Sequence, residues 1–483
     1  MPSKVNASND TKLAGPPGVG VDSMAGQRSV RHRGAALVGF VAAMTTVASG
    51  CGTRLAETSF STASTTANVS AAETTGVTVA ALSDPGLTAS SIKLGLVVSK
   101  TSPLGAETFS PPMYGAQAFI AALNAAGGVN GRHVDLVVCD DGATGAGNRS
   151  CVTKLIDDDK IFAFVSNTVF EYAGASYVND AGVPDVGGQP IGNEYDQYPH
   201  LWSIYGSGSP RNGTIGFNGT LYGGSEVYRY FARTLGAETA AVVGYNQADS
   251  QRFANLTATA LSLEGYTVVR EQLNFAVPSW DSAVVDMKSR GVDIVFDALD
   301  SAGNVSLCKA MDGAGMRVKA KVVTVQAWSE SVRTDYQSSR TCRNSLYATA
   351  TTRNYMDTDN AMIATFRSEM RAAFPQREAK MSMWELEGWA GAQWLTDAMT
   401  SCGAALSRVC VEKYLRRPEP YDGHTVFTPR NFVAETAPSA TAHNCLFAAR
   451  WADSAYNGTG GWVTTTPGKQ PACFDVANVE YTP

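Results

Sequence analysis

The 483-residue sequence is poor in histidine and in charge, and these shortages exclude several classes of function. It contains five histidines, which leaves few candidates for a histidine-based metal or acid–base centre. Charged residues make up 17% and the formal net charge is −6, so the basic patch of a nucleic-acid-binding protein is missing. Cys-x-x-Cys, His-Glu-x-x-His and a Gly-x-Ser-x-Gly elbow at a strand-to-helix turn are also missing. We therefore predict no metal centre, no cofactor and no nucleophilic hydrolase site.

The first long apolar run is too short to span a bilayer comfortably. It covers residues 34–48, follows Arg28, Arg31 and Arg33, and is about 15 residues long. Such a run behind positive charges is typical of the h-region of a secretory signal peptide. Residues 1–50 are therefore predicted to be a leader and signal peptide, with the start at either Met1 or Met24.

The signal-like run ends at small residues directly before Cys51. This arrangement resembles a bacterial lipobox, which implies that Cys51 receives diacylglycerol and becomes the mature N-terminus. The alternative is an ordinary signal peptide with a chance cysteine. Residues 53–82 are mostly Ser, Thr and Ala without periodicity, a composition that cannot bury enough surface to fold. Residues 51–90 are thus predicted to be a lipidated cysteine and a flexible tether.

Cysteine usage indicates disulfides. Nine cysteines are present, and eight remain if Cys51 carries lipid. An even number in an exported chain favours disulfide bonds, although eight cysteines allow 105 pairings. Local spacing favours sequential pairing, with a buried free thiol as the alternative at each position. The predicted pairs are Cys139–Cys151, Cys308–Cys342, Cys402–Cys410 and Cys445–Cys473.

From Ser91 onward, short β-branched runs alternate with longer helical patterns. The first series has expected strands at residues 92–98, 134–139, 161–165, 183–186 and 201–205, and helices at 114–126, 148–157 and 172–180. The second has helices at 225–235, 253–264, 282–290, 305–313, 359–374 and 384–401, and strands at 240–245, 267–273, 293–298, 321–325 and 345–350. Alternation of this kind gives parallel sheets covered on both faces. Two such series predict two α/β lobes with a cleft between them.

Several segments resemble one family. They are residues 94–105 (LGLVVSKTSPLG), 115–124 (GAQAFIAALN), 126–132 (AGGVNGR), 134–141 (VDLVVCDD), 293–299 (DIVFDAL), 308–312 (CKAMD) and 402–410 (CGAALSRVC). Together they look like branched-chain amino-acid-type periplasmic binding proteins, the type I solute receptors of ABC importers. The resemblance covers residues 91–417, and 127–131 (GGVNG) is its most specific part. It implies two Rossmann-like lobes with parallel sheets joined by three crossovers, which close around a solute by hinge motion.

The resemblance also implies domain boundaries. The first lobe is expected to comprise residues 91–206 with 345–417, and the second lobe residues 207–344 with 418–483. The glycine-rich residues 206–209 are interpreted as a hinge rather than a phosphate loop.

Candidate ligand-binding residues lie in loops after the expected strands, where open parallel sheets bind their ligands. Thr101 and Ser102 follow the first strand and precede a helix start, where free N–H groups and hydroxyls can hold a carboxylate; a plain connecting loop is the alternative. The resemblance implies that Asn167 and Thr168 contact a ligand carboxylate. It also implies polar contacts from Gln189, for which an exposed surface amide is the alternative.

Three second-lobe residues are further candidates. The resemblance implies that Tyr245 lines the cleft at the end of its strand. Asp300 follows the strand at 293–298, where a carboxylate pairs with a ligand ammonium; its alternative role is the N-cap of the next helix. Trp328 is expected to form a wall of the pocket, with core or interlobe packing as the alternative.

The sequence therefore predicts a protein that binds and does not catalyse. We expect an extracytoplasmic chain, anchored by Cys51 to the outer face of the cell membrane, that captures a small polar solute such as an amino acid. The expected partners are this solute and the permease of an ABC importer, with no nucleic acid. A ligand sensor of the same fold, signalling to a partner protein, is the alternative. A secreted enzyme is disfavoured because His133, His200, His424 and His443 occur in no nucleophile context.

Overall fold

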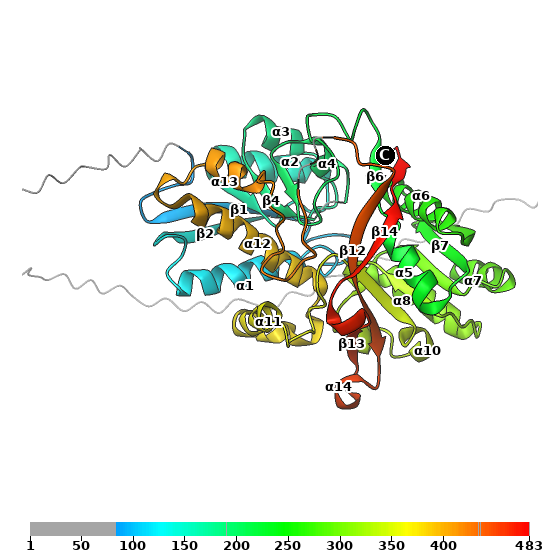
Figure 1. Ribbon diagram of the computed structural model, residues 1–483. Helices are drawn as coiled ribbons and strands as arrows, with labels where there is room; N and C mark the ends of the chain where they lie inside the picture. The colour runs from blue at the N-terminus through cyan, green and yellow to red at the C-terminus, as the bar shows by residue number, and fades with distance from the viewer. Residues whose placement is uncertain (1–83, 190, 433, 435, 483) are drawn as a thin grey trace, which may run out of the picture. The chain divides into compact units, whose positions relative to one another are not determined.

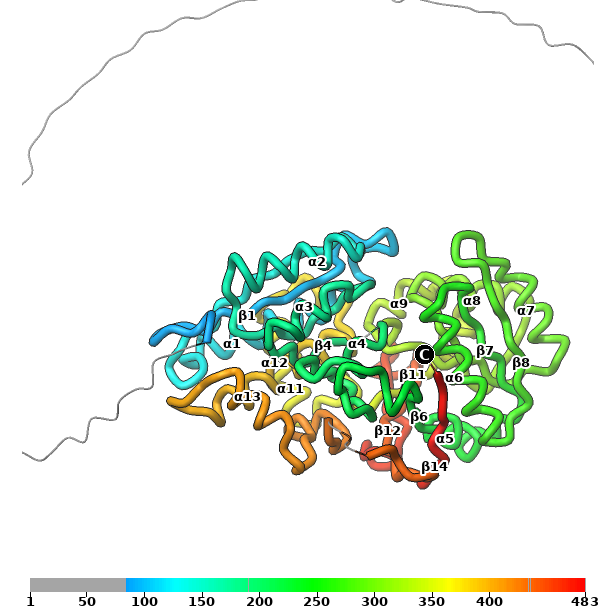
Figure 2. Tube along the Cα trace, turned by 90° about the horizontal axis from the view of Figure 1, so that it is seen from above, coloured from blue at the N-terminus to red at the C-terminus, as the bar shows by residue number. Residues whose placement is uncertain are grey.

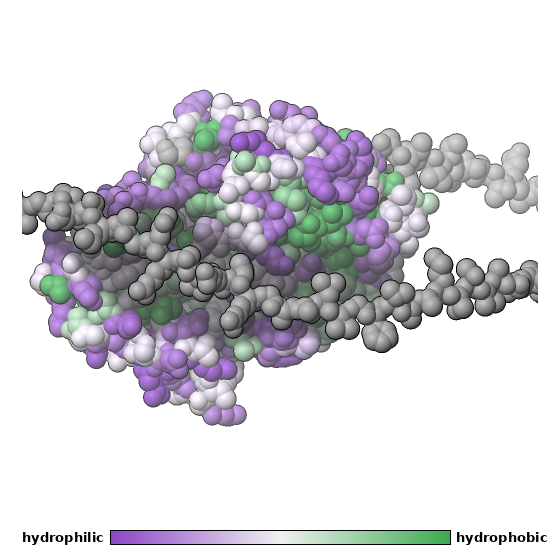
Figure 3. Space-filling view, turned by 180° about the vertical axis from the view of Figure 1, so that it is seen from behind, coloured by the Kyte–Doolittle hydropathy of each residue, from purple (hydrophilic) through white to green (hydrophobic). Residues whose placement is uncertain are grey.

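The computed structural model describes residues 84–189, 191–432, 434 and 436–482, which belong to one compact unit. The predicted leader, signal peptide, Cys51 and most of the predicted tether lie outside these residues. Among the described residues, no helix is long and apolar enough to cross a membrane. On the face seen in Figure 3, hydrophilic side chains cover much of the visible surface.

The first lobe is a five-stranded parallel sheet with strand order β2-β1-β3-β4-β5 and helices on both faces (Figure 1). Its strands are β1 (Ser91–Val98), β2 (His133–Asp140), β3 (Ala163–Val165), β4 (Asp185–Gly188) and β5 (Leu201–Ser203). Its helices are α1 (Pro111–Ala125), α2 (Gly145–Thr153), η1 (Lys154–Asp158), α3 (Ala175–Asp180), α4 (Glu194–Gln197), α11 (Ala361–Ala373), η3 (Pro375–Lys380), α12 (Met383–Cys402), η4 (Gly403–Ala405) and α13 (Arg408–Leu415). Leu96 packs in the cluster of α1 and α12, whereas Val97 packs in that of α2 and α3, as strand alternation requires.

The 20-residue helix α12 lies directly against α1 and β4. It begins with a capping box, in which the Ser382 hydroxyl accepts from the Glu385 N–H and the Glu385 carboxylate accepts from the Ser382 N–H. A Cβ at Gly115 would collide with the Glu385 carbonyl, and one at Gly388 with the Pro112 carbonyl. The absence of these Cβ atoms lets the two helix backbones meet, which fixes the N-terminal end of α12 beside the cleft.

The second lobe is a larger sheet with order β13-β12-β11-β10-β9-β7-β8, in which β14 also pairs with β12. Strands β7 to β11 run parallel to one another. Strand β12 is antiparallel to its neighbour β11, and β13 is antiparallel to β12. The strands are β7 (Thr239–Tyr245), β8 (Thr267–Leu273), β9 (Ile294–Ala298), β10 (Ala320–Val323), β11 (Leu346–Ala350), β12 (Thr441–Ala452), β13 (Gly461–Thr464) and β14 (Ala472–Ala477). A separate pair consists of β6 (Leu221–Gly223) and β15 (Val479–Tyr481).

Helices cover both faces of the second sheet. Residues of α5 and α6 share a core cluster with Val242 and Phe296, and residues of α7 and α8 share another with Val243 and Val295. The helices are α5 (Glu226–Leu235), α6 (Ala248–Leu263), α7 (Trp280–Ser289), α8 (Ser301–Gly313), η2 (Val325–Ala327), α9 (Val332–Asp335), α10 (Arg340–Arg343), α14 (Ala455–Gly458) and η5 (Pro467–Lys469). In the view of Figure 2, α5 to α8 lie at one end and α1, α2, α12 and α13 at the other.

Three chain segments join the lobes, one after β5, one after β11 and one between α13 and β12. Arg430, on the third segment, ties them together. Its Nη1 donates to the Ile204 carbonyl on the first (2.9 Å), and its Nη2 to the Thr351 carbonyl on the second (3.3 Å). Two lobes with parallel sheets and three crossovers confirm the predicted fold class.

Two details differ from the sequence-based expectation. The strand at 345–350 was assigned to the first lobe, yet β11 pairs with β10 in the second sheet, so the return to the first lobe follows Ala350. Helix α6 begins at Ala248 rather than near 253, because the Gln247 side chain caps it by accepting from the Ser250 N–H (3.0 Å). The earlier start places the charged side chains of the first turn beside the cleft.

The four predicted disulfides are confirmed. Cys139–Cys151 joins β2 to α2, and Cys402–Cys410 joins α12 to α13 in the first lobe. Cys308–Cys342 joins α8 to α10, and Cys445–Cys473 joins β12 to β14 in the second. His443 lies within ligand distance of the last pair. Because both sulfurs are bonded to each other, this group does not offer the thiolates that a metal site requires.

Candidate functional site

The principal cavity, of about 650 Å³, lies between the lobes. Residues from the carboxyl ends of β7, β9 and β10 and from the start of α6 form its second-lobe side. Residues after β1, β3 and β4, together with Trp384 of α12, form its first-lobe side. The location agrees with the rule that open parallel sheets bind ligands beyond the carboxyl ends of their strands.

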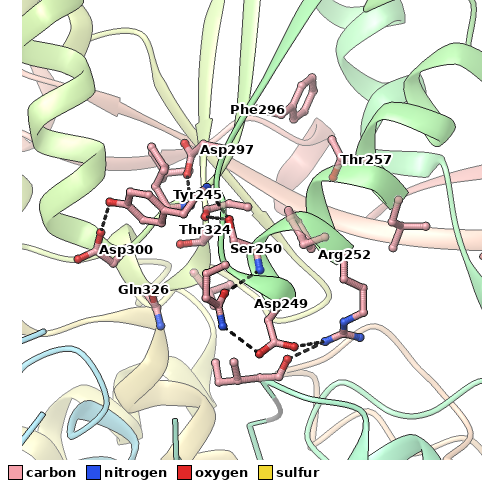
Figure 4. A pocket seen from close by; sticks show the side chains of 18 of the residues that line it. Tyr245, Asp249, Ser250, Arg252, Thr257, Phe296, Asp297, Asp300, Thr324 and Gln326 are labelled. Atoms are coloured by element: carbon pink, nitrogen blue, oxygen red, sulfur yellow. Dashed lines mark hydrogen bonds and ion pairs between the residues drawn. The ribbon is translucent and has the colours of Figure 1, made fainter. Parts of the chain in front are cut away.

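Tyr245 and Asp300 form the centre of the second-lobe wall (Figure 4). The Tyr245 hydroxyl donates to Asp300 Oδ1 (2.8 Å), and the same oxygen accepts from the Gly303 N–H (3.0 Å). Asp300 therefore caps α8, which was its alternative role, and it also lines the cavity. Burial and the nearby Asp300 carboxylate raise the pKa of Tyr245 well above its usual value. The phenol stays neutral and holds the carboxylate in place.

A second aspartate of this wall has its charge compensated. Asp297 Oδ2 lies 2.7 Å from Lys321 Nζ, and both side chains are fully buried. The Asn304 amide donates to Asp297 Oδ1 (3.1 Å), and burial lowers the pKa of Lys321. Asp297 is thus paired with a lysine, whereas Asp300 has no basic partner among the described residues.

Arg252 of α6 links the two lobes across the cavity. It donates to the Ile191 carbonyl (2.7 Å) and to the Asn193 side chain, and it lies 3.7 Å from Asp249. Its Nε is buried without a hydrogen-bond partner, as is the Thr324 hydroxyl on the same cavity. Buried polar atoms normally have partners, so these two atoms are exceptions among the described residues.

A second cavity of about 360 Å³ adjoins the first, because the two share Phe170, Ile191, Gly192 and Asp249. Gln189 and Asn167 line it. Gln189 is only 2% exposed, and neither its amide nitrogen nor its oxygen has a partner. Asn167 instead has structural bonds: its oxygen accepts from the Val97 N–H (2.7 Å) and its amide donates to the Tyr172 hydroxyl (3.1 Å).

Ser102 lines a third adjoining cavity of about 480 Å³, together with Tyr245 and Asp300. Three predicted residues line none of these cavities. Thr101 is exposed, and its N–H donates to Asp140 (3.1 Å). Thr168 is fully buried, and Trp328 is fully buried against Trp462, with ring centroids 5.9 Å apart. The short helix η2 follows β10, so Trp328 packs in the core, which was its alternative role.

The sequence-based prediction missed cavity residues in several regions, among them the starts of α6 and α12. Gln247, Asp249, Ser250 and Arg252 belong to the start of α6, and the rule on strand ends would have included them had the helix start been placed correctly. Trp384 begins α12, and its indole donates to the Tyr205 hydroxyl (3.2 Å). No local sequence signal brings these two distant residues together.

The comparisons with known proteins agree with this geometry. The sequence model of the family described as periplasmic binding protein matches residues 91–457. No curated protein matches the chain.

Solved structures show the same fold at low identity. The fatty acid ABC transporter substrate-binding protein of Thermomonospora curvata has a TM-score of 0.60 and 15% identity, covering 80% of this chain and 95% of its own. The branched-chain amino acid transporter substrate-binding protein of Streptococcus pneumoniae, in complex with isoleucine, has a TM-score of 0.57 and 16% identity. The match covers 77% of this chain and 99% of that protein. A solute-binding protein of Rhodopseudomonas palustris, in complex with 3,4-dihydroxybenzoic acid, has a TM-score of 0.59 and 14% identity. The match covers 80% of this chain and 98% of that protein.

The matched family is described as one of binding proteins, and the solved structures with the same fold include substrate-binding proteins of ABC transporters. The family model covers most of the chain, and the solved structures share its overall fold. The chain therefore belongs to the periplasmic binding protein family and has its type I fold.

Proposed function

We propose that this protein is a lipid-anchored solute-binding protein that captures a small solute in the cleft between its lobes and delivers it to an ABC importer. The observation that carries the proposal is the interlobe cavity of about 650 Å³, with Asp300 and Tyr245 on one wall and Arg252 reaching the other lobe. A volume of this size is typical of small-molecule sites. The structural neighbours are complexed with solutes as different as isoleucine and 3,4-dihydroxybenzoic acid, so the solute must be inferred from this chain's own residues.

The polar end of the cavity favours a solute with an ammonium or another donor group, such as an amino acid. Asp300 has no basic partner among the described residues, whereas Asp297 has Lys321. A carboxylate accepting a charge-assisted bond contributes about 1.5–3 kcal/mol. Asp300→Asn should therefore weaken amino-acid binding about tenfold or more, measured by titration calorimetry of the full-length chain.

Asparagine is the informative replacement because it is as good an N-cap as aspartate. Asp300→Asn keeps the cap of α8, so the unliganded melting temperature should change little. Asp300→Ala is the matched comparison: it also removes the cap and should cost roughly 1 kcal/mol of stability. Equal affinity of wild type and Asp300→Asn for every amino acid that binds would remove Asp300 from the site.

The anchor is proposed from the lipobox-like residues before Cys51. In a bacterial host, the full-length chain should incorporate a labelled fatty acid and sediment with membranes. Cys51→Ser should abolish the label and reduce sedimentation. Labelling that persists in Cys51→Ser would contradict lipidation at this cysteine.

A further inference from the structure

The interlobe cavity extends beyond its polar wall into an apolar recess of the second lobe. The recess lies between the sheet and the helices that cover one of its faces. Its walls come from α5, α6, β9 and β10, and comprise Val227, Tyr228, Leu256, Thr257, Phe296 and Val322. Figure 4 shows Phe296 and Thr257 apart from Asp300, Gln326 and Asp249. The single cavity thus has one polar end and one apolar end.

The apolar end offers little for a polar solute to bind. The Tyr228 hydroxyl donates to Thr257 Oγ1 (3.2 Å), so these two polar groups satisfy each other. The Tyr228 and Phe296 rings pack edge to face at 5.1 Å, which fixes the floor. Burial raises the pKa of Tyr228 to about 12, so no charge develops there. A solute confined to the polar end would leave these surfaces without a partner.

Helices that cover a parallel sheet normally pack on it at the density of a core. Here Val227 of α5 and Leu256 of α6 remain only partly buried while they face the cavity. Apolar surface gains free energy when it is removed from water. Val227 and Leu256 pack against the core cluster of the second sheet, and an apolar ligand group in the recess would cover the apolar surface that they leave exposed.

We propose that the solute is amphipathic, with a polar head at Asp300, Thr324 and Arg252 and a hydrocarbon body in the recess beneath α5 and α6. This inference rests on the proposed function of solute capture and adds the chemical class of the solute. Asp300, Thr324 and Arg252 all line this cavity, and they carry the carboxylate, the hydroxyl and the guanidinium that the head would contact. The hydrocarbon body distinguishes this solute from a small polar amino acid.

The test is a series of 2-amino acids that share one polar head and differ in the length of the hydrocarbon chain, and their affinities are compared. 2-Aminobutyric, 2-aminohexanoic, 2-aminooctanoic and 2-aminodecanoic acids are titrated into the full-length chain, with protein-free titrations as blanks. Each methylene buried in the recess should tighten binding about fourfold until the recess is full. Octanoic acid and octylamine, which each lack one half of the head, should bind more weakly than 2-aminooctanoic acid.

A matched pair of variants tests whether the gain in affinity from a longer hydrocarbon chain depends on the recess. Leu256 and Leu263 both belong to α6, but Leu256 lines the recess whereas Leu263 is 55% exposed. Leu256→Trp should reduce the affinity for 2-aminooctanoic acid at least tenfold and leave 2-aminobutyric acid nearly unchanged, whereas Leu263→Trp should change neither. Val227→Phe fills the recess from α5 and replaces Leu256→Trp if that variant does not fold.

The outcomes separate this inference from the function on which it rests. Binding of the short amino acids with no gain from added methylenes would overturn the amphipathic solute and leave solute capture standing. Equal loss of short and long members in Leu256→Trp would also overturn it. No binding by any member of the series, including octanoic acid and octylamine, would count against both proposals.

Discussion

Each lobe buries one aspartate behind a cavity wall, and the two lobes stabilise these carboxylates differently. In the second lobe, Asp297 on β9 pairs with Lys321 on the neighbouring strand β10 at 2.7 Å. In the first lobe, Asp185 on β4 has no such cation. Its Oδ2 accepts from the Tyr172 hydroxyl (2.6 Å) and the Tyr195 hydroxyl (2.7 Å) instead.

The missing cation bears on how the Asp185 carboxyl titrates. Burial raises the pKa of Asp185 to about 6, although the two hydroxyl donors oppose the rise. Two neutral donors therefore compensate only part of the desolvation cost. Tyr172 and Tyr195 line the cavity that adjoins the principal one, so the first-lobe wall rests on a group sensitive to pH, whereas the second-lobe wall rests on an ion pair.

The largest expected effect is the loss of stability when the ion pair between Asp297 and Lys321 is broken. Lys321→Met leaves Asp297 buried without its cation, which should reduce the free energy of unfolding by about 3–5 kcal/mol, measured by urea denaturation at pH 7. Lys319→Met is the matched control. Lys319 lies 2.7 Å from Asp293 but is 42% exposed, and exposed pairs contribute at most about 1 kcal/mol. Equal losses in the two variants would show that burial does not distinguish the pairs.

The next prediction concerns the pH dependence of Asp185. Its pKa is about 6 in the folded chain and 3.8 when exposed, so the folded state binds the proton more tightly. The contribution of this group is favourable at low pH and is lost as pH rises from about 4 to 6, by about 3 kcal/mol.

Asp185→Asn removes this titration. The difference in unfolding free energy between variant and wild type should therefore shift in favour of the variant between pH 4 and pH 7, measured by urea denaturation at several pH values. Asp180→Asn, at an exposed position of α3, should show a constant difference. A constant difference for Asp185→Asn as well would mean that Asp185 ionises normally in the folded chain.

The sequence was sufficient to predict most of the architecture because the relevant signals are local. Alternating strand and helix patterns predicted the two lobes, and β8 has the bounds expected from its β-branched run. The spacing of cysteines predicted the four disulfides. Asp300 was a candidate because it follows a strand end and Tyr245 because of the family resemblance, and both line the cavity.

The remainder depends on packing between distant segments, which periodicity does not encode. Val227 and Leu256 are ordinary apolar positions of their helices, and nothing in their spacing indicates that they also line a cavity. Trp328 was assigned to the pocket because its loop follows a strand, but its indole packs against Trp462 of β13. The bond from Tyr195 to Asp185 was missed because α4 is only four residues long.

Loss of the hydrogen bond from Tyr195 to Asp185 should give the smallest of the expected effects on stability. Tyr195→Phe removes one of the two hydroxyl donors to Asp185 Oδ2. Loss of a donor to the charged form raises the carboxyl pKa further above 6. The variant should therefore be less stable than wild type by about 1–2 kcal/mol at pH 8, and by less at pH 5, where the carboxyl is protonated in both proteins.

Tyr177→Phe is the control for loss of a tyrosine hydroxyl. Tyr177 is 40% exposed and donates to Asp157 (2.7 Å), so its loss should cost little at either pH. A deficit in Tyr195→Phe that is equal at pH 5 and pH 8 would mean that the hydroxyl stabilises packing rather than the carboxylate charge. A deficit that grows with pH would show that the first lobe stabilises by hydrogen bonds the charge that the second lobe stabilises by an ion pair.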